Sequence, residues 1–292
     1  MISTVCLLKR QTVKFNNARD HLMPVTFRIL GCGSSGGVPR IHGDWGDCDA
    51  SNPKNRRTRC SMLVKKTGTD GTTNLLIDTS PDMRDQLIDA GTDWLDGVFY
   101  THDHADQTHG IDDLRAMVYA RRERIKVWMD TATAQTLTKR FGYCFNQLGG
   151  SDYPSILEDN RIDVPYAEIT VDGAGGALCA IPFRQIHGRI DSLGFRIGNV
   201  AYSSDISDLP EESEGALRDL DVWVVDALRR TPHPTHFHLE KTLKMIEKVK
   251  PRRAILTNLH IDMDYETLTG ELPENVCPAY DGMEFCESQA IN

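Results

Sequence analysis

The feature that most constrains this chain is a short polar run, Thr101 to Asp106 (THDHAD), which directly follows the apolar segment 97–100. In an extended chain, side chains two residues apart point to the same side. His102, His104 and Asp106 can therefore converge at the mouth of a sheet, and two imidazoles with a carboxylate suit zinc, manganese or iron. An isolated H-x-H-x-D run is explained about equally well as a solvated turn, so other parts of the chain must decide.

Three further candidate ligands follow apolar segments that have the pattern of strands. His187 ends one such segment, Asp205 follows 199–203, and His260 follows 253–257. A single histidine or aspartate after a strand is more often a capping or turn residue. When four strand ends all carry such residues, that explanation weakens, because strand ends are where α/β folds place their chemistry. The sequence therefore predicts one site built from these ends.

Segments with strand and helix patterns alternate along the chain. Predicted strands lie at 25–30, 61–66, 73–78, 97–100, 125–129, 177–186, 193–197, 199–203, 221–226 and 253–257. Predicted helices lie at 81–90, 111–122, 131–141, 210–218 and 236–249. This order favours a layered α/β fold with sheets inside and helices outside. The Gly- and Asp-rich stretch 144–176 is expected to be an insertion over the site.

Composition and charge exclude several classes of protein. A formal charge of −9 does not provide the basic surface that general binding to nucleic acid or a membrane needs, and no apolar run approaches the ~18–20 residues of a membrane span. The 8 cysteines are scattered without a C-x-x-C pair, which is typical of reduced thiols in a cytoplasmic protein. No linker divides the chain, so the expected organisation is a leader over 1–23 and one domain over 24–292. A homodimer is left open.

With these motifs in place, the chain resembles the metallo-β-lactamase-fold hydrolases, in which an H-x-H-x-D-H loop precedes a distant His, a bridging Asp and a final His. It is most similar to their phosphodiesterase branch, which includes phosphoribosyl cyclic phosphate phosphodiesterases and, more distantly, tRNase Z. The features that carry this likeness are the G-x-G-x-x-G-G-V-P loop at 31–39, the Arg-rich segment 56–61 and the segment 235–240 (THFHLE). The resemblance implies a four-layer αββα sandwich over about 25–287.

The resemblance also implies two divalent metal ions, zinc or manganese, that share one carboxylate. By position, their ligands are His102, His104 and His187 for the first ion, Asp205 as the bridge, and Asp106 and His260 for the second ion. The fourth histidine of the family loop is missing, because position 107 is glutamine. A neutral amide oxygen is a poorer ligand than an imidazole, so the second site is expected to be weaker or to contain an extra water.

The implied activity is that of a metal-dependent phosphodiesterase, which hydrolyses a small cyclic or nucleotide-like phosphodiester through a metal-bound hydroxide. Asp106 would orient the hydroxide. His236 would act as the general acid or contact the phosphate, and His238 is the second candidate for this role. The competing explanation for His236 and His238 is that they are surface residues at the start of a helix. The alternatives are another hydrolase of this fold, such as a lactonase, thioesterase or β-lactamase, and a non-catalytic metal- or nucleotide-binding module. The negative charge disfavours tRNA processing.

Two other features have weaker interpretations. The Gly-rich loop 31–39 does not fit a dinucleotide fingerprint, because Pro39 follows its glycines where a helix would be needed. Arg57 and Arg59 are interpreted as a solvated basic loop, with contact to a phosphate as the alternative.

Overall fold

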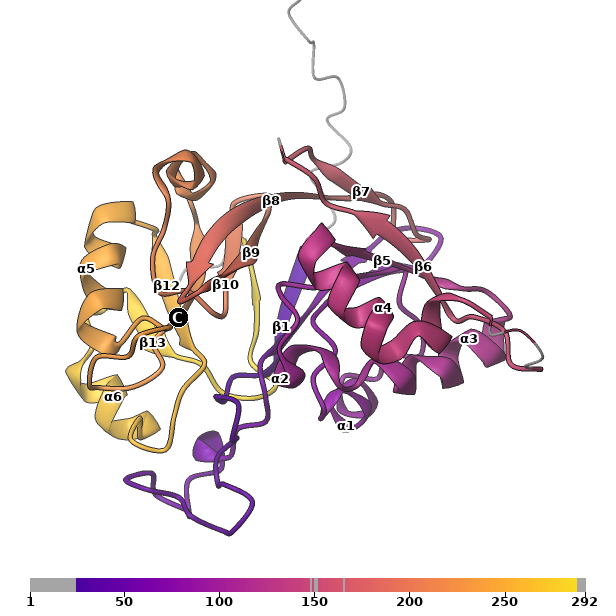
Figure 1. The fold of residues 1–292 in the computed structure, drawn as a ribbon. Helices are drawn as coiled ribbons and strands as arrows, with labels where there is room; N and C mark the ends of the chain where they lie inside the picture. Colours follow the sequence, from indigo (N-terminus) through magenta and orange to yellow (C-terminus); the bar gives the residue numbers. More distant parts are fainter. Residues whose placement is uncertain (1–24, 148, 150–151, 165, 288–292) are drawn as a thin grey trace, which may run out of the picture.

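Two facing β-sheets with helices on their outer sides form the described part of the protein (Figure 1). The computed structural model describes residues 25–147, 149, 152–164 and 166–287. The leader expected over 1–23 lies outside these residues. The four-layer αββα sandwich expected from the sequence is confirmed.

Each sheet has seven strands. The first sheet has the order β14 (Glu284–Cys286), β1 (Val25–Gly31), β2 (Ser61–Thr67), β3 (Thr72–Ile77), β4 (Gly97–Phe99), β5 (Ile125–Met129) and β6 (Leu157–Arg161). The second has the order β13 (Val276–Pro278), β12 (Arg253–Thr257), β11 (Val222–Asp226), β10 (Val200–Ser203), β9 (Ile190–Ile197), β8 (Leu178–His187) and β7 (Ile169–Val171).

The helices cover the outer faces of the sheets. They are α1 (Met83–Asp89), α2 (Ala105–Thr108), α3 (Arg115–Arg121), α4 (Thr131–Phe145), α5 (Leu239–Val249) and α6 (Tyr265–Glu271), with 3-10 turns at Pro53–Asn55, Ile111–Leu114 and Glu211–Leu217. Helices α1, α3 and α4 pack on the first sheet, and α5 and α6 pack on the second (Figure 1). No helix in the described part of the chain is long and apolar enough to cross a membrane.

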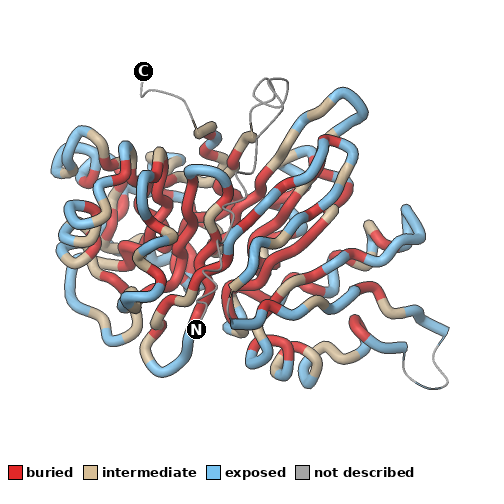
Figure 2. Tube along the Cα trace, turned by 90° about the horizontal axis from the view of Figure 1, so that it is seen from above, coloured by how far each residue is buried: buried red, intermediate tan, exposed pale blue. Residues whose placement is uncertain are grey.

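Both faces of the inner strands are buried, which explains why their sequences are almost continuously apolar. In β11, Val222 and Val224 face the space between the sheets, whereas Trp223 and Val225 face α5 and α6. Between the sheets, the ring of Phe99 packs against the ring of Phe195, with a distance of 4.8 Å between their centroids. Figure 2 shows this burial along the strands, with exposed residues on the outer helices and loops. Each fully buried large side chain contributes roughly 1.5–3 kcal/mol.

The direction of the strands places the polar residues that follow them at one edge of the sandwich. Strands β3 to β6 are mutually parallel, as are β10 to β13. Parallel strands end at the same edge of a sheet, so the segments that follow β10 and β12 lie together. Residues after β4, in the first sheet, line one cavity with them. This arrangement brings the polar residues after these strands to one side of the sandwich.

The structure corrects several sequence-based expectations. The stretch 144–176 contributes an edge strand to each sheet, β6 and β7. The helix expected from residue 236 begins at Leu239, and the helix expected over 111–122 is divided into a 3-10 turn and α3. Strands β13 and β14 were not predicted, because three residues are too few to show a periodic pattern.

Candidate metal centre

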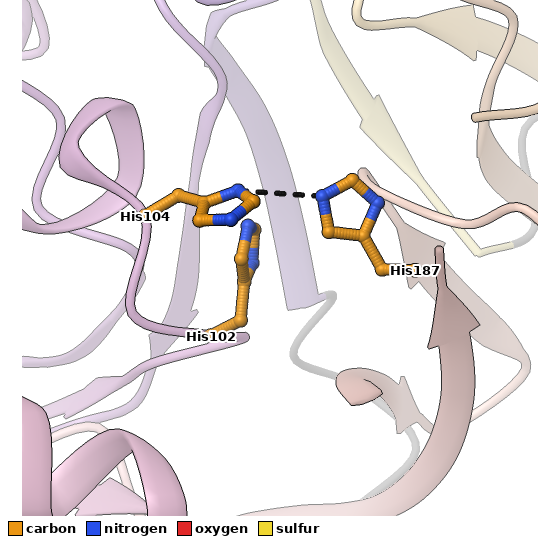
Figure 3. Close-up of side chains that lie close together, drawn as sticks. All are labelled: His102, His104 and His187. Carbon is orange, nitrogen blue, oxygen red and sulfur yellow. Dashed lines mark hydrogen bonds between the residues drawn. The ribbon is translucent and has the colours of Figure 1, made fainter. Parts of the chain in front are cut away.

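Three histidine side chains meet where the loop after β4 approaches the end of β8 (Figure 3). His102 and His104 come from that loop, and His187 is the last residue of β8. Nδ1 of His104 lies 3.3 Å from Nε2 of His187. The three rings have centroid distances of 4.5–5.0 Å, and one nitrogen of each lies within 4.8 Å of the other two. The sequence spacing and the fold thus place three imidazoles around one point.

Neighbouring acceptors decide which ring nitrogens face that point. The hydroxyl of Thr101 donates to Oδ2 of Asp78 over 2.8 Å, so its oxygen accepts a hydrogen bond from Nδ1–H of His102 over 2.9 Å. The carbonyl of Thr235 accepts from Nδ1–H of His187 over 2.6 Å. Both Nε2 atoms therefore carry lone pairs toward the centre, where that of His187 lies within hydrogen-bond distance of Nδ1 of His104. Nε2 of His102 is buried and has no partner among the described residues.

These residues fit a divalent metal ion. Two nitrogens bound to one tetrahedral ion at about 2.0–2.1 Å lie about 3.3–3.4 Å apart, and the observed separation of His104 and His187 is 3.3 Å. Burial lowers the pKa of His102 to about 3 and also lowers the pKa of His187. Both rings are therefore neutral near pH 7, which is the form that binds metal.

Asp205 and His236 extend the centre toward the second sheet. Asp205 follows β10 and is 3% exposed, and its carboxylate, with nitrogens of His187 and His236, forms a second group within 4.8 Å. Nδ1 of His236 donates to Oδ2 of Asp226 over 2.7 Å and lies 3.8 Å from Oδ1 of Asp205. Burial alone would lower the pKa of His236, but these carboxylates outweigh it and raise the pKa to about 9.

Asp226 is a functional candidate that the sequence analysis missed. It ends β11, is fully buried, and holds the ring of His236. Burial raises its own pKa to about 7. The signal was present, because an acidic residue at the end of an apolar strand is the pattern that selected Asp205.

The centre opens into a cavity of about 440 Å³. Its lining is Ser34, Ser35, Gly36, Arg40, His104, Asp106, His187, Asp205, Leu228, Arg229, His233, Thr235, His236, Asn258 and His260. His238 is not among these residues, because it lies at the N-terminus of α5. None of the described residues of 144–176 lines the cavity, so the expectation of an insertion over the site is wrong for them.

The second half of the expected two-metal site is arranged differently. Asp106 lies in the first turn of α2, so the argument from alternating extended backbone holds only for His102 and His104. Neither Asp106 nor His260 belongs to a group of three or more ligand side chains within 4.8 Å, among the residues that the structure describes. Nδ1 of His260 donates to Oδ1 of Asp262 over 2.9 Å, and its Nε2 accepts from the guanidinium of Arg40.

The Arg-rich segment has mainly a structural role. Arg57 is 2% exposed and donates to the carbonyl of Met263 over 2.8 Å, so its interpretation as a solvated residue is wrong. Arg59 is half-buried and pairs with Asp82 at 2.8 Å. Gly33 must be glycine, because a Cβ there would lie 2.9 Å from both Cβ of Arg57 and the carbonyl oxygen of Thr58.

Comparisons with known proteins agree with this geometry. A family model described as the beta-lactamase superfamily domain matches residues 73–261. A solved structure described as a new diphosphatase from the PhnP family is 34% identical, with a TM-score of 0.79, and the match covers 89% of this chain and 97% of that one. The short form of human tRNase Z is 14% identical with a TM-score of 0.62, covering 90% and 100%, and so shares the fold.

A curated relative, an octanoyltransferase of Porphyromonas gingivalis, is 32% identical over 265 residues. The match covers 88% of this chain but only 50% of the relative, so the chain spans about half of that protein's length. The family model covers well over half of the described residues, and the diphosphatase matches along nearly its whole length. The chain therefore belongs to the beta-lactamase superfamily and has the sandwich fold of the metallo-β-lactamase-fold hydrolases.

Proposed function

We propose that the protein is a metal-dependent phosphodiesterase that hydrolyses a small phosphorylated substrate, either a cyclic or nucleotide-like phosphodiester or a diphosphate. The observation that carries this proposal is the character of the cavity beside the three histidines. Among the described residues, Leu228 is the one large apolar side chain that lines it. A cavity of about 440 Å³ has room for a phosphorylated small molecule.

The charge of the cavity wall favours an anionic substrate. Three cationic side chains, Arg40, Arg229 and His236, line it against two carboxylates, Asp106 and Asp205. A guanidinium binds phosphoryl oxygens through paired hydrogen bonds. Lactones and acyl thioesters would need an apolar wall for their carbon chains. The overall charge of −9 is therefore compatible with a local cationic site for a small anion.

Different side chains would bind the metal ion, donate a proton and orient the attacking water. A divalent ion held by His102, His104, His187 and Asp205 would supply an activated water as nucleophile and a Lewis acid for a phosphoryl oxygen. His236, held by Asp226 through its Nδ1–H, presents its other nitrogen as the proton donor for the departing oxygen. Asp106 lines the same cavity and orients the attacking water.

Relatives support this class of substrate. The 34% identical structure is described as a diphosphatase, so a phosphoanhydride or phosphodiester is the substrate we infer here. The octanoyltransferase name belongs to a protein of which this chain matches 50%, and the polar cavity does not favour an octanoyl chain.

A substrate panel tests the proposal. The protein would be loaded with manganese or with zinc and assayed on phosphodiesters, cyclic nucleotides, nucleoside diphosphates, a lactone, a thioester and a β-lactam. We expect turnover only of the phosphorus compounds, and no turnover in His104→Ala. Turnover confined to the acyl compounds would overturn the proposal.

A further inference from the structure

The position at which family members would bind a second ion carries two hydrogen-bond donors in this chain. Nε2 of Gln107 donates to Oδ2 of Asp205 over 3.2 Å. On the other side, Arg40 donates to Nε2 of His260. These are two of the three groups that the resemblance assigns to a second ion; the third, the carboxylate of Asp106, lines the same cavity. The residues present therefore do not fit a second ion.

The Gly-rich loop positions Arg40. The guanidinium lies over Gly36, where an added Cβ would be 3.4 Å from Nη1 of Arg40. Arg40 lines the cavity beside the histidines and also an adjoining cavity of about 430 Å³. Its hydrogen bond is to a neutral acceptor, because Nδ1–H of His260 already donates to Asp262. In the part of the chain that the structure describes, no carboxylate forms an ion pair with Arg40.

The electrostatics oppose a second ion here. A divalent cation between Asp205 and His260 would be attracted by the carboxylates of Asp205 and Asp106. It would also have to displace two donors, the guanidinium of Arg40 and the amide N–H group of Gln107, whose positive ends oppose it. The guanidinium is always charged and offers a planar fork that matches two phosphoryl oxygens. Arg40 therefore has the charge and the geometry to do what a second ion does for a phosphate.

We propose that the centre holds one divalent ion, on His102, His104, His187 and Asp205, and that Arg40 contacts the substrate phosphate in place of a second ion. His260 and Asp262 then form a support that aims the guanidinium at the cavity. The identity of the anion as a phosphate rests on the proposed function, whereas the number of ions does not.

Metal stoichiometry tests the first part. After equilibrium dialysis against manganese, the wild type and Gln107→His should each retain one equivalent, because Arg40 is present in both. The double variant Arg40→Ala/Gln107→His should bind two equivalents and show the exchange-coupled spectrum of a manganese pair by electron paramagnetic resonance. Arg229→Ala, which removes another guanidinium of the same cavity, should stay at one. Two equivalents in the wild type, or one in the double variant, would overturn the proposal.

Phosphate binding tests the second part. With one equivalent of manganese bound, Arg40→Ala should weaken the binding of inorganic phosphate by about 10–100-fold, the effect of losing a charge-assisted pair of hydrogen bonds. Arg40→Lys should recover part of the affinity, because lysine keeps the charge and loses the fork. Arg84→Ala, on the exposed face of α1, is the control and should bind like the wild type. Equal affinity in Arg40→Ala and the wild type would contradict the proposal.

The two proposals fail separately. If no phosphorus compound is hydrolysed, the proposed function fails, and the metal count and phosphate affinity still test the role of Arg40. If phosphodiesters are hydrolysed by an enzyme with two ions, the proposed function stands and the role of Arg40 is overturned.

Discussion

The two halves of the centre are built on different parts of the fold. His102 follows the end of β4 by three residues and His187 is the last residue of β8, and a hydrogen bond from Nδ1–H fixes each ring. Arg40 begins an exposed loop, in which the side chain of Ile41 is fully exposed. Rigid strand ends suit metal ligands, which must hold fixed distances. An exposed loop suits a substrate contact that can adjust, because loops carry variation more easily than strands.

The largest effect should come from breaking the strand-end half. His104→Ala should remove tightly bound metal and abolish turnover, because the ion that supplies the nucleophile is lost. Because the side chain of His104 is exposed, the melting temperature without metal should change little. Metal analysis and thermal unfolding in a chelator would check both. Tightly bound metal in His104→Ala, or a large fall in its melting temperature in the chelator, would contradict the assignment.

The second-largest effect should come from His236, the proposed general acid, which lines the same cavity as His104 and Arg40. His236→Asn should lower turnover by about 10²–10⁴-fold for an ester with a poor leaving group. A p-nitrophenyl ester should lose much less, because its leaving group needs no proton. The ratio of the two rates measures proton donation and is insensitive to general damage. Equal losses on both esters would assign His236 to metal binding, together with His187 and Asp205.

A smaller effect is expected from the support of the first half. Thr101→Val keeps the shape but removes the hydroxyl between Asp78 and His102, so metal affinity should fall by about 10–100-fold. Competition with a chromogenic chelator measures this change. Unchanged affinity would mean that the ring of His102 does not need this hydrogen bond.

The smallest effect should come from His238, which lies outside the cavity lining. His238→Ala should leave turnover and metal content within about twofold of the wild type, the scale of a surface change. This variant separates the two histidines that the sequence offered as acids. A loss as large as that of His236→Asn would reverse their roles.

The fold and the candidate metal ligands at strand ends could be predicted from the sequence, because both depend on the apolar pattern of buried strands. Strands buried on both faces are almost continuously apolar, so an Asp just after one stands out, as Asp205 does after β10. His187 ends β8, in which exposed residues alternate with buried ones over the first half. The roles of these residues in metal binding remain predictions. The same rule would have found Asp226, had it been applied to the strand 221–226.

Other parts depend on distant partners and could not be predicted in this way. Strand β14 pairs with β1, from the other end of the chain, and shows no pattern of its own. The burial of Arg57 depends on the carbonyl of Met263, 206 positions away. Arg40 is in an irregular exposed loop, and only its contact with His260 indicates a role.

The proposal of one ion on three histidines and Asp205 is tested most directly by X-ray absorption spectroscopy of the zinc-loaded wild-type protein. It reports the ligands of the ion and any neighbouring ion in one measurement. We expect three imidazole nitrogens and one oxygen at about 2.0–2.2 Å and no metal–metal scattering. A zinc–zinc distance of about 3.5–4 Å, or a shell without imidazole scattering, would contradict it.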